Sequence, residues 1–133
     1  MVAEDTINGL GGNDTLTGGG GADTLTGGAG ADRITYTALF QSISGQADRV
    51  TDFSRAQKDK ISLSAIDANS GVAGDQAFSF IGSAAFSRAA GQLRAFTSVS
   101  ETHIAGDVNG DLIGDFLIRL GTVTTLQASD FIA

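Results

Sequence analysis

Residues 9–35 read GLGGNDTLT, GGGGADTLT and GGAGADRIT, which are three consecutive units of nine residues. Glycine stands at the first and fourth places of every unit, aspartate at the sixth, and leucine or isoleucine at the eighth. Residues 1–8 fit as the tail of an earlier unit, with Asp5 and Ile7 in register, and Leu10 replaces glycine at the second place of the first full unit. Self-similarity at a short fixed period predicts a repeat architecture in which successive units stack.

Each unit predicts a turn followed by a short strand. Glycine at several places allows positive φ and close approach of backbone carbonyls, which favours a turn over the first six residues. In Thr24-Leu25-Thr26, β-branched residues flank an apolar one, so a short strand with the leucine inward is expected. Parallel strands then form a solenoid with two units per coil, which places Asp5 over Asp23 and Asp14 over Asp32.

The stacked turns predict a metal site. Carboxylates one strand apart repel one another unless a cation lies between them, and the carbonyls of glycine turns also need partners. Calcium, with about six to eight oxygen ligands in flexible geometry, suits such turns better than magnesium or a soft metal. The predicted ligands in the repeats are carboxylates and turn carbonyls of Asp5, Gly9, Gly11, Asn13, Asp14, Gly18, Gly20, Ala22, Asp23, Gly27, Ala29, Ala31 and Asp32.

The register also predicts where the aspartate series ends. Extended by one unit, it places Gln41 where the next aspartate would stand, so the series is expected to stop at Asp32. Asp48 and Asp52 either complete metal sites at that boundary or are ordinary strand-end and turn residues, and the sequence leaves both readings open.

Composition excludes several classes of protein. The chain has 133 residues, 19 glycines, no cysteine and a single histidine, which excludes disulfide scaffolds and thiolate metal sites. Its net charge of −7 argues against nucleic acids and anionic membrane surfaces as partners, and no apolar run is long enough for a membrane span. The lone His103 has no nucleophile or triad beside it in the sequence, so no catalytic site is expected in this chain.

The repeats and the residues after them resemble known families. The units match the pattern G-G-x-G-x-D-x-U-x, with U apolar, of the calcium-binding nonapeptide repeats of RTX proteins. Residues 48–67, DRVTDFSRAQKDKISLSAID, resemble the region after the repeats in serralysin-type proteases, and residues 78–96 and 107–133 continue this resemblance. It implies an all-β fold: a short parallel β-roll over residues 1–35, followed by an antiparallel β-rich cap over residues 36–133.

The same resemblance implies a function. Such modules bind several calcium ions and lie at the ends of monomeric, extracellular proteins exported by the type I secretion machinery, with a catalytic domain such as a protease, lipase or epimerase upstream. Folding on calcium binding outside the cell is expected, because the empty repeats combine a high glycine entropy with carboxylate repulsion. The alternative is an accessory module that binds an alginate-like polysaccharide, which requires a cationic track that the sequence does not place.

The cap is predicted to consist of short strands around phenylalanines. Alternating patterns predict strands over Arg33–Thr37, Asp48–Phe53, Asp59–Leu63 and Asp115–Leu120. Single helical turns are expected over Ser64–Ala68 and Gly82–Ser87. The predicted core residues are Phe78, Phe80, Phe86, Phe96 and Phe116.

Two further segments of the cap are candidate sites. Residues 107–111, DVNGD, open like an EF-hand loop, but Ile118 stands at the twelfth place, where an acidic ligand is needed. Asp107, Asn109 and Asp111 therefore form either a different calcium site, with Asp115 as a further ligand, or a polar turn. The tetrapeptide Asp130-Phe131-Ile132-Ala133 resembles the uncleaved secretion signal of serralysin-type proteins.

Overall fold

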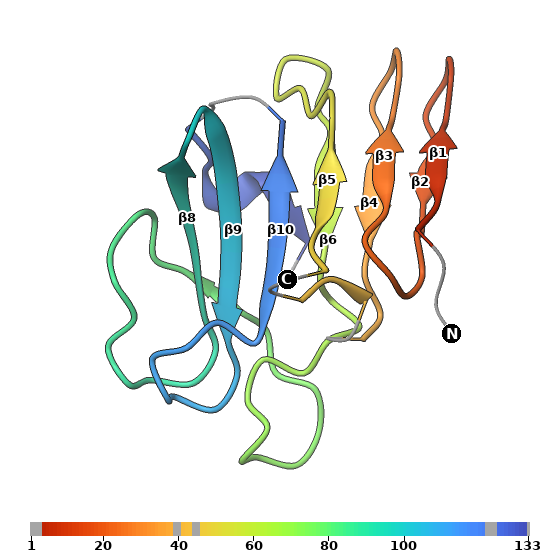
Figure 1. The fold of residues 1–133 in the computed structure, drawn as a ribbon. Helices are drawn as coiled ribbons and strands as arrows, with labels where there is room; N and C mark the ends of the chain where they lie inside the picture. The colour runs from red at the N-terminus through yellow and green to blue at the C-terminus, as the bar shows by residue number, and fades with distance from the viewer. Residues whose placement is uncertain (1–3, 39–40, 44–45, 122–124, 133) are drawn as a thin grey trace.

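The structure, a computed structural model, describes residues 4–38, 41–43, 46–121 and 125–132 of the chain. These residues form short strands in two sheets, joined by glycine-rich turns (Figure 1). No helix among the described residues has the length and apolar character needed to cross a membrane. The strands are β1 (Thr6–Asn8), β2 (Thr15–Leu16), β3 (Thr24–Thr26), β4 (Arg33–Thr35), β5 (Asp48–Val50), β6 (Lys60–Ser62), β7 (Ser79–Phe80), β8 (Gln92–Ser98), β9 (Glu101–Asp107), β10 (Phe116–Leu120) and β11 (Phe131–Ile132).

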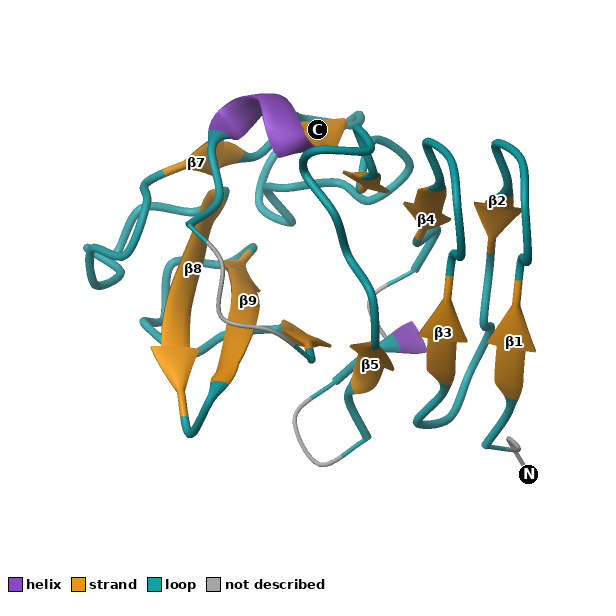
Figure 2. Ribbon diagram, turned by 90° about the horizontal axis from the view of Figure 1, so that it is seen from above, coloured by secondary structure: helices purple, strands orange, loops and turns teal. Residues whose placement is uncertain are grey.

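The repeat region forms a parallel β-roll. Strands β1, β3 and β5 lie side by side in one sheet, and β2, β4 and β6 lie in the other, so the chain alternates between the sheets (Figure 2). Thr6 pairs with Thr24 and Thr15 pairs with Arg33, each at a separation of two units. The predicted coil of two units is therefore confirmed, as is the all-β class.

One apolar residue per strand points into the roll. Leu16, Leu25 and Ile34 are buried, and they contact the same hydrophobic core as Val50 and Ile61 of the next coil. Burial of these side chains removes apolar surface from water and supplies the main attraction between the two sheets. The apolar eighth place of each unit therefore has the inward position that the sequence predicts.

The roll continues past the change in composition near residue 35. Strand β3 pairs with β5, and β4 pairs with β6, in the parallel arrangement of the earlier coils. Residues 36–47 are inserted between β4 and β5, so paired residues of successive coils are farther apart in the sequence here, as for Thr24 and Arg49, than the 18 residues between Thr6 and Thr24. The third coil therefore comes from residues 48–62, and the sheets do not break at the compositional boundary.

The cap extends the first sheet. Strand β10 pairs in parallel with β5, after which β10, β9 and β8 pair antiparallel and β7 lies parallel to β8. The longest strands form the β8–β9 hairpin, whose turn residues Val99 and Ser100 have φ values of +45° and +64°. A two-residue turn with positive φ normally carries asparagine or glycine, so the sequence contains no signal for this hairpin.

The predicted cap elements are partly confirmed. All four predicted strands exist in shortened form, as β4, β5, β6 and β10. The two predicted helical turns are wrong, because residues 64–68 and 82–87 form non-helical turns and bends. Of the five predicted core phenylalanines, Phe78 and Phe116 are buried and meet edge to face, with ring centroids 5.6 Å apart. The other three are only partly buried.

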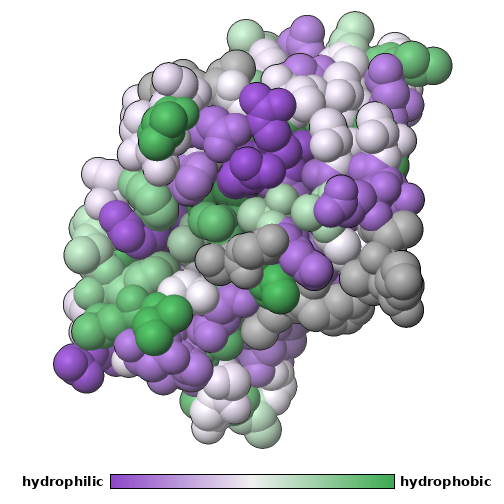
Figure 3. All heavy atoms as spheres, in the orientation of Figure 1, coloured by the Kyte–Doolittle hydropathy of each residue, from purple (hydrophilic) through white to green (hydrophobic). Residues whose placement is uncertain are grey.

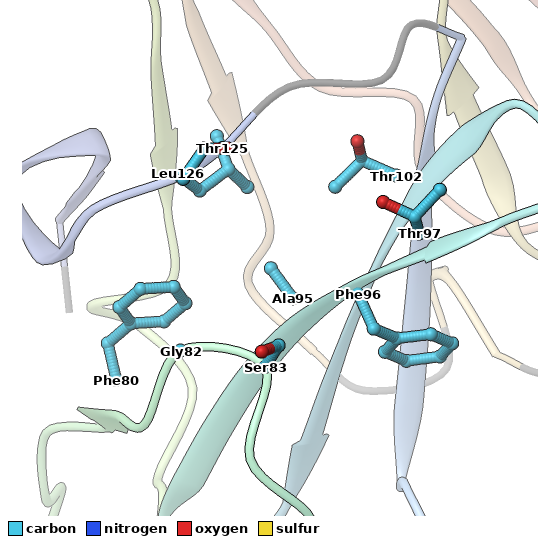
Figure 4. Close-up of a pocket in the computed structure, with 9 residues that line it drawn as sticks. All are labelled: Phe80, Gly82, Ser83, Ala95, Phe96, Thr97, Thr102, Thr125 and Leu126. Carbon is cyan, nitrogen blue, oxygen red and sulfur yellow. The ribbon is translucent and has the colours of Figure 1, made fainter.

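A cavity of about 400 Å³ lies between one end of the β8–β9 hairpin and the C-terminal segment. Figure 4 shows Phe80, Ala95 and Leu126 facing this space, whereas the ring of Phe96 points to the other face of β8. Among the described residues that line the cavity none is titratable, so these residues offer no general acid or base.

Candidate metal centre

The aspartates of the repeat form a ladder across the coils. Asp23 Oδ1 accepts a hydrogen bond from the Asp5 amide, and Asp32 Oδ1 accepts one from the Asp14 amide, each at 2.9 Å and 18 residues apart. The predicted stacking of these aspartates is thus confirmed. We call this series of aspartates the aspartate ladder.

The aspartate ladder continues beyond Asp32, so the expected end at that residue is wrong. Asp48 Oδ1 accepts a hydrogen bond from the Asp23 amide at 2.8 Å, and Asp59 Oδ1 accepts one from the Asp32 amide at 2.9 Å. Gln41 lies in the inserted segment, where its side-chain oxygen accepts a hydrogen bond from the Thr37 amide. The insertion shifts the sequence register, but pairing of β5 with β3 and of β6 with β4 restores the structural register.

Asp59 was not singled out from the sequence, although a signal for it exists. Asp48-Arg-Val50 and Asp59-Lys-Ile61 both keep the last part of the repeat, an aspartate two places before an inward apolar residue. A search for this short pattern without the nine-residue spacing would have found both positions.

The second carboxylate oxygen of the repeat aspartates has no partner. The Oδ2 atoms of Asp14, Asp23 and Asp32 are buried and accept no hydrogen bond from the described residues. Protein interiors rarely leave polar atoms unsatisfied, because an unpaired buried carboxylate oxygen costs free energy. Three equivalent atoms in three successive units therefore indicate a missing positively charged partner.

Each unpartnered oxygen faces a space that only glycine leaves open. A methyl group built on Gly18 or Gly27 would lie 2.4 Å from the Oδ2 of Asp23 or Asp32, respectively. On Gly9 it would lie 2.6 Å from Asp14 Oδ2 and also 2.8 Å from the Gly27 carbonyl oxygen of the next coil. Beside Gly9, oxygen atoms from two coils thus converge on a small space, and beside Gly18 and Gly27 the carboxylate oxygen of the same unit does so.

The electrostatics of this space favour a hard cation. Burial raises the pKa of the Asp23 carboxyl, and the negative charges of Asp5 and Glu4 raise it further. The hydrogen bond from the Asp5 amide lowers this pKa, but by less than burial raises it. A cation among these oxygens would offset the free-energy cost of burying a charged carboxylate. The donors are carboxylate and carbonyl oxygens alone, which suit calcium rather than a soft metal. Asp14 and Asp32 stack in one series of turns and Asp23 lies in the other, so they would hold separate ions, together with carbonyl groups of the glycine turns.

The other ligands predicted in the repeats lie on the same stacked turns. Asn13 Oδ1 accepts a hydrogen bond from the Ala31 amide at 2.9 Å, so its side chain already bridges two coils. Asp5 is exposed and contributes its amide to the ladder. The predicted carbonyl ligands remain predictions: Gly9, Gly11, Gly18, Gly20, Ala22, Gly27, Ala29 and Ala31.

The last aspartates of the roll are bonded differently. Asp48, Asp52 and Asp59, which we call the end rung, each use both carboxylate oxygens as hydrogen-bond acceptors. The hydroxyl group of Tyr36 donates to Asp48 Oδ2 at 2.9 Å, and the Ser54 amide donates to Asp59 Oδ2 at 2.9 Å. Asp52 accepts the amides of Gly27 and Gly28 at 2.9 and 2.8 Å. Protein donors therefore satisfy these carboxylates.

Burial also affects the end rung. It raises the pKa of Asp48 to about 6, against the opposing effects of the hydrogen bonds from the Asp23 amide and the Tyr36 hydroxyl. It raises the pKa of Asp59 as well. The prediction that Asp48 and Asp52 complete metal sites stays a prediction, with structural hydrogen bonding as the alternative.

The loop at residues 107–115 gathers three acids. One carboxylate oxygen each from Asp107, Asp111 and Asp115 lie within 4.8 Å of one another. The fully buried Asp107 accepts amide hydrogen bonds from Asn109, at 3.2 Å, and from Gly110 and Leu112. Burial raises the pKa of Asp115, and the charges of Asp111 and Asp107 add to the increase. A polar turn and a calcium site both fit this geometry.

Two arginines and a histidine lie in a row across the outer face of the first sheet, the face that points away from the second sheet. Arg49, Arg119, His103 and Phe96 are successive cross-strand partners on β5, β10, β9 and β8. Glu101 lies among them and accepts from Arg49 Nε at 2.8 Å. Figure 3 shows strongly hydrophilic atoms over the upper middle of this face, where Figure 1 places β10 and β5.

The row of Arg49, Arg119 and His103 ends in an aromatic cluster. The guanidinium group of Arg94 lies 4.3 Å from the Phe96 ring centroid and 5.7 Å from that of Phe86, which are cation–π distances. The exposed Leu112 and Ile113 border the same region. The sequence could not place these arginines together, because they come from strands that are far apart in the chain.

Two sheets of parallel coils with glycine–aspartate turns, extended at one end by an antiparallel sheet, define an RTX-type β-roll module. The family model described as Peptidase M10 serralysin C terminal matches residues 1–133, and the chain belongs to this family. The resemblance drawn from the repeats and from residues 48–67 is thus confirmed. Membership supports the assignment of this chain as a calcium-binding module of a secreted protein. The family is the C-terminal part of serralysin peptidases and not their catalytic part.

A solved structure shares this fold. The AlgE6R3 subunit from the Azotobacter vinelandii mannuronan C5-epimerase is similar with a TM-score of 0.62 and 24% identity, over 96% of this chain and 67% of that one. The AlgE6R2 subunit of the same enzyme has a TM-score of 0.42 and 21% identity, over 97% of this chain and 87% of that one. No curated protein sequence matches the chain.

Proposed function

We propose that this chain is a calcium-dependent folding module of a secreted protein. The observation that carries the proposal is the set of three buried, unpartnered Oδ2 atoms of Asp14, Asp23 and Asp32, each aimed at a glycine of its own turn. Membership in the serralysin C-terminal family supports the same reading.

The repeats supply little folding energy of their own. Glycine loses more backbone entropy on ordering than any other residue, and each coil buries few apolar side chains. The buried carboxylates add a desolvation cost. When bound, calcium supplies positive charge and several coordination positions for these oxygens. The carboxylates of the roll orient and hold the ion, so that binding energy becomes folding energy.

Calcium titration followed by circular dichroism tests this function. We expect a gain of β signal with calcium, its reversal by chelator, and a much smaller gain with magnesium. The double variant Asp14→Asn/Asp23→Asn should require at least about tenfold more calcium for the same gain, whereas Asp75→Asn, at an exposed loop position, should not. A chain that is equally folded in chelator would contradict the proposal.

We further propose that Asp130-Phe131-Ile132-Ala133 acts in type I export, with a catalytic domain elsewhere in the protein. In the structure Asp130 and Phe131 are buried, and Ala133 lies outside the described residues. Export from a host that carries a type I exporter should fall on replacement of these four residues by glycine and serine. A matched replacement at the exposed residues 72–75 should leave export unchanged.

A second candidate function is binding of an anionic polysaccharide such as alginate. The observation that favours it is the row of Arg49, Arg119 and His103 beside the aromatic cluster around Arg94. Calorimetric titration with alginate oligomers should show binding that weakens with salt and that Arg119→Ala reduces. Arg33→Ala, at an exposed position of the second sheet, is the control. No heat of binding at low salt would exclude this function.

A further inference from the structure

Residues 128–132 close the second sheet. Strand β11 pairs in parallel with β6 through Phe131 and Ile61, and the Leu63 amide donates to the Ile132 carbonyl at 2.7 Å. The Phe131 ring is buried and lies 5.1 Å from the Phe80 ring centroid. Phe131 and Ile132 of the segment proposed above for export therefore form a strand of the folded sheet.

Polar anchors hold the same segment. The Asp130 side chain is only 7% exposed, and its carboxylate accepts a hydrogen bond from Arg55 Nε at 2.7 Å. The ammonium group of Lys60 donates to the Ser129 carbonyl. Both cations belong to residues 52–62, the segment that ends the roll.

Residues 52–62 also hold the last repeat unit. Asp52 accepts the amides of Gly27 and Gly28, and Asp59 accepts the amide of Asp32. Strand β6 pairs with β4 along one edge and with β11 along the other. One short segment thus contacts a candidate metal turn on one side and the C-terminal strand on the other.

We propose that residues 52–62 couple ordering of the repeat turns to docking of residues 128–132. Ordered turns position Arg55, Lys60 and β6, and these in turn bind the C-terminal strand. Conversely, a docked C-terminal strand favours the ordered turns, because coupling between two sites is reciprocal. This coupling rests on the proposed calcium-dependent folding. It makes the roll a switch: residues 128–132 are exposed before calcium binds and buried afterwards.

Hydrogen exchange on the whole chain, read by mass spectrometry with and without calcium, tests the coupling. Calcium should slow exchange in the repeat peptide 9–26 and in the peptide 125–132 over the same range of concentration. Asp130→Asn and Arg55→Ala should each raise the calcium concentration for half-protection of the repeat peptide by at least about fivefold. Arg88→Ala, at an exposed position in the cap, should leave it unchanged.

The outcomes separate the coupling from the function on which it rests. Protection of the repeats with no change in peptide 125–132 would overturn the coupling and leave calcium-dependent folding intact. Unchanged half-protection in Asp130→Asn and Arg55→Ala, with the β8–β9 hairpin protected as in the unsubstituted chain, would overturn it too. No protection of the repeats by calcium would instead remove the proposed function.

Discussion

The repeat turns and the end rung both use aspartate, but the carboxylates are bonded differently in the two regions. In the repeats, Asp23 and Asp32 each accept one amide hydrogen bond from the neighbouring coil. The Oδ2 atoms of Asp14, Asp23 and Asp32 are buried and have no hydrogen-bond partner among the described residues. In the end rung, a tyrosine hydroxyl and backbone amides satisfy both oxygens of each aspartate. The roll therefore ends on carboxylates satisfied by the protein itself, next to turns whose carboxylates each keep one oxygen without a partner among the described residues.

The largest expected effect comes from filling the space that the repeats keep open. In Gly27→Ala the new methyl group would lie 2.4 Å from Asp32 Oδ2, and Asp32 can move only by losing its hydrogen bond to the Asp14 amide. We expect a loss of about 3 kcal/mol in the free energy of unfolding with calcium, measured by urea denaturation. Gly11→Ala, where no atom lies within 4 Å of the added methyl, should change it by less than about 0.5 kcal/mol.

The end rung predicts a dependence of stability on pH without calcium. The pKa of Asp48 is about 6 in the folded chain, above its ordinary value of 3.8, so ionisation destabilises the fold. In chelator, stability should be greatest below about pH 4 and fall by about 2–3 kcal/mol as the pH rises through 6. Asp48→Asn should remove most of this fall in urea denaturation at pH 4.5 and 7. An unchanged pH profile in the variant would assign the dependence to another group.

A matched pair of variants tests the comparison itself. Asp23→Asn removes a buried charge with an unpartnered oxygen, so it should stabilise the chain by about 1 kcal/mol in chelator and destabilise it by about 2 kcal/mol with calcium. Asp52→Asn removes an acceptor for a glycine amide and should cost about 1–2 kcal/mol in both conditions. If both variants responded alike to calcium, the distinction between repeat turns and end rung would be wrong.

The smallest expected effect concerns Leu10, the exception within the repeats. Leu10 has a φ of +65° and is 69% exposed, at the place that glycine occupies in the other two units. Leu10→Gly should stabilise the chain by about 1 kcal/mol, since leucine is strained in this conformation. The reverse change at the equivalent place, Gly19→Ala at φ +77° with no atom near the added methyl, should cost about as much. Thermal unfolding with calcium measures both.

Much of the candidate metal centre follows from the repeats alone. The period of nine places aspartates one coil apart, and the alternation around Leu16, Leu25 and Ile34 determines which side chains point inward. These are local rules, because each coil contacts mainly its neighbours. They hold as far as Ile34.

Beyond Ile34 the tertiary structure decides. Asp48 and Asp59 continue the ladder only because the chain returns to the same two sheets after the inserted residues 36–47. No spacing in the sequence predicts this return. The β8–β9 hairpin turns at Val99 and Ser100 without the usual turn residues, and only pairing with β10 and packing of Ile104 explain its position. The nine-residue repeat by itself therefore determined the coil and its candidate cation ligands, since both depend on contacts at one constant separation. Contacts between distant segments produce the end rung, the row of Arg49, Arg119 and His103, and the buried C-terminal strand. Only the folded chain brings these segments together.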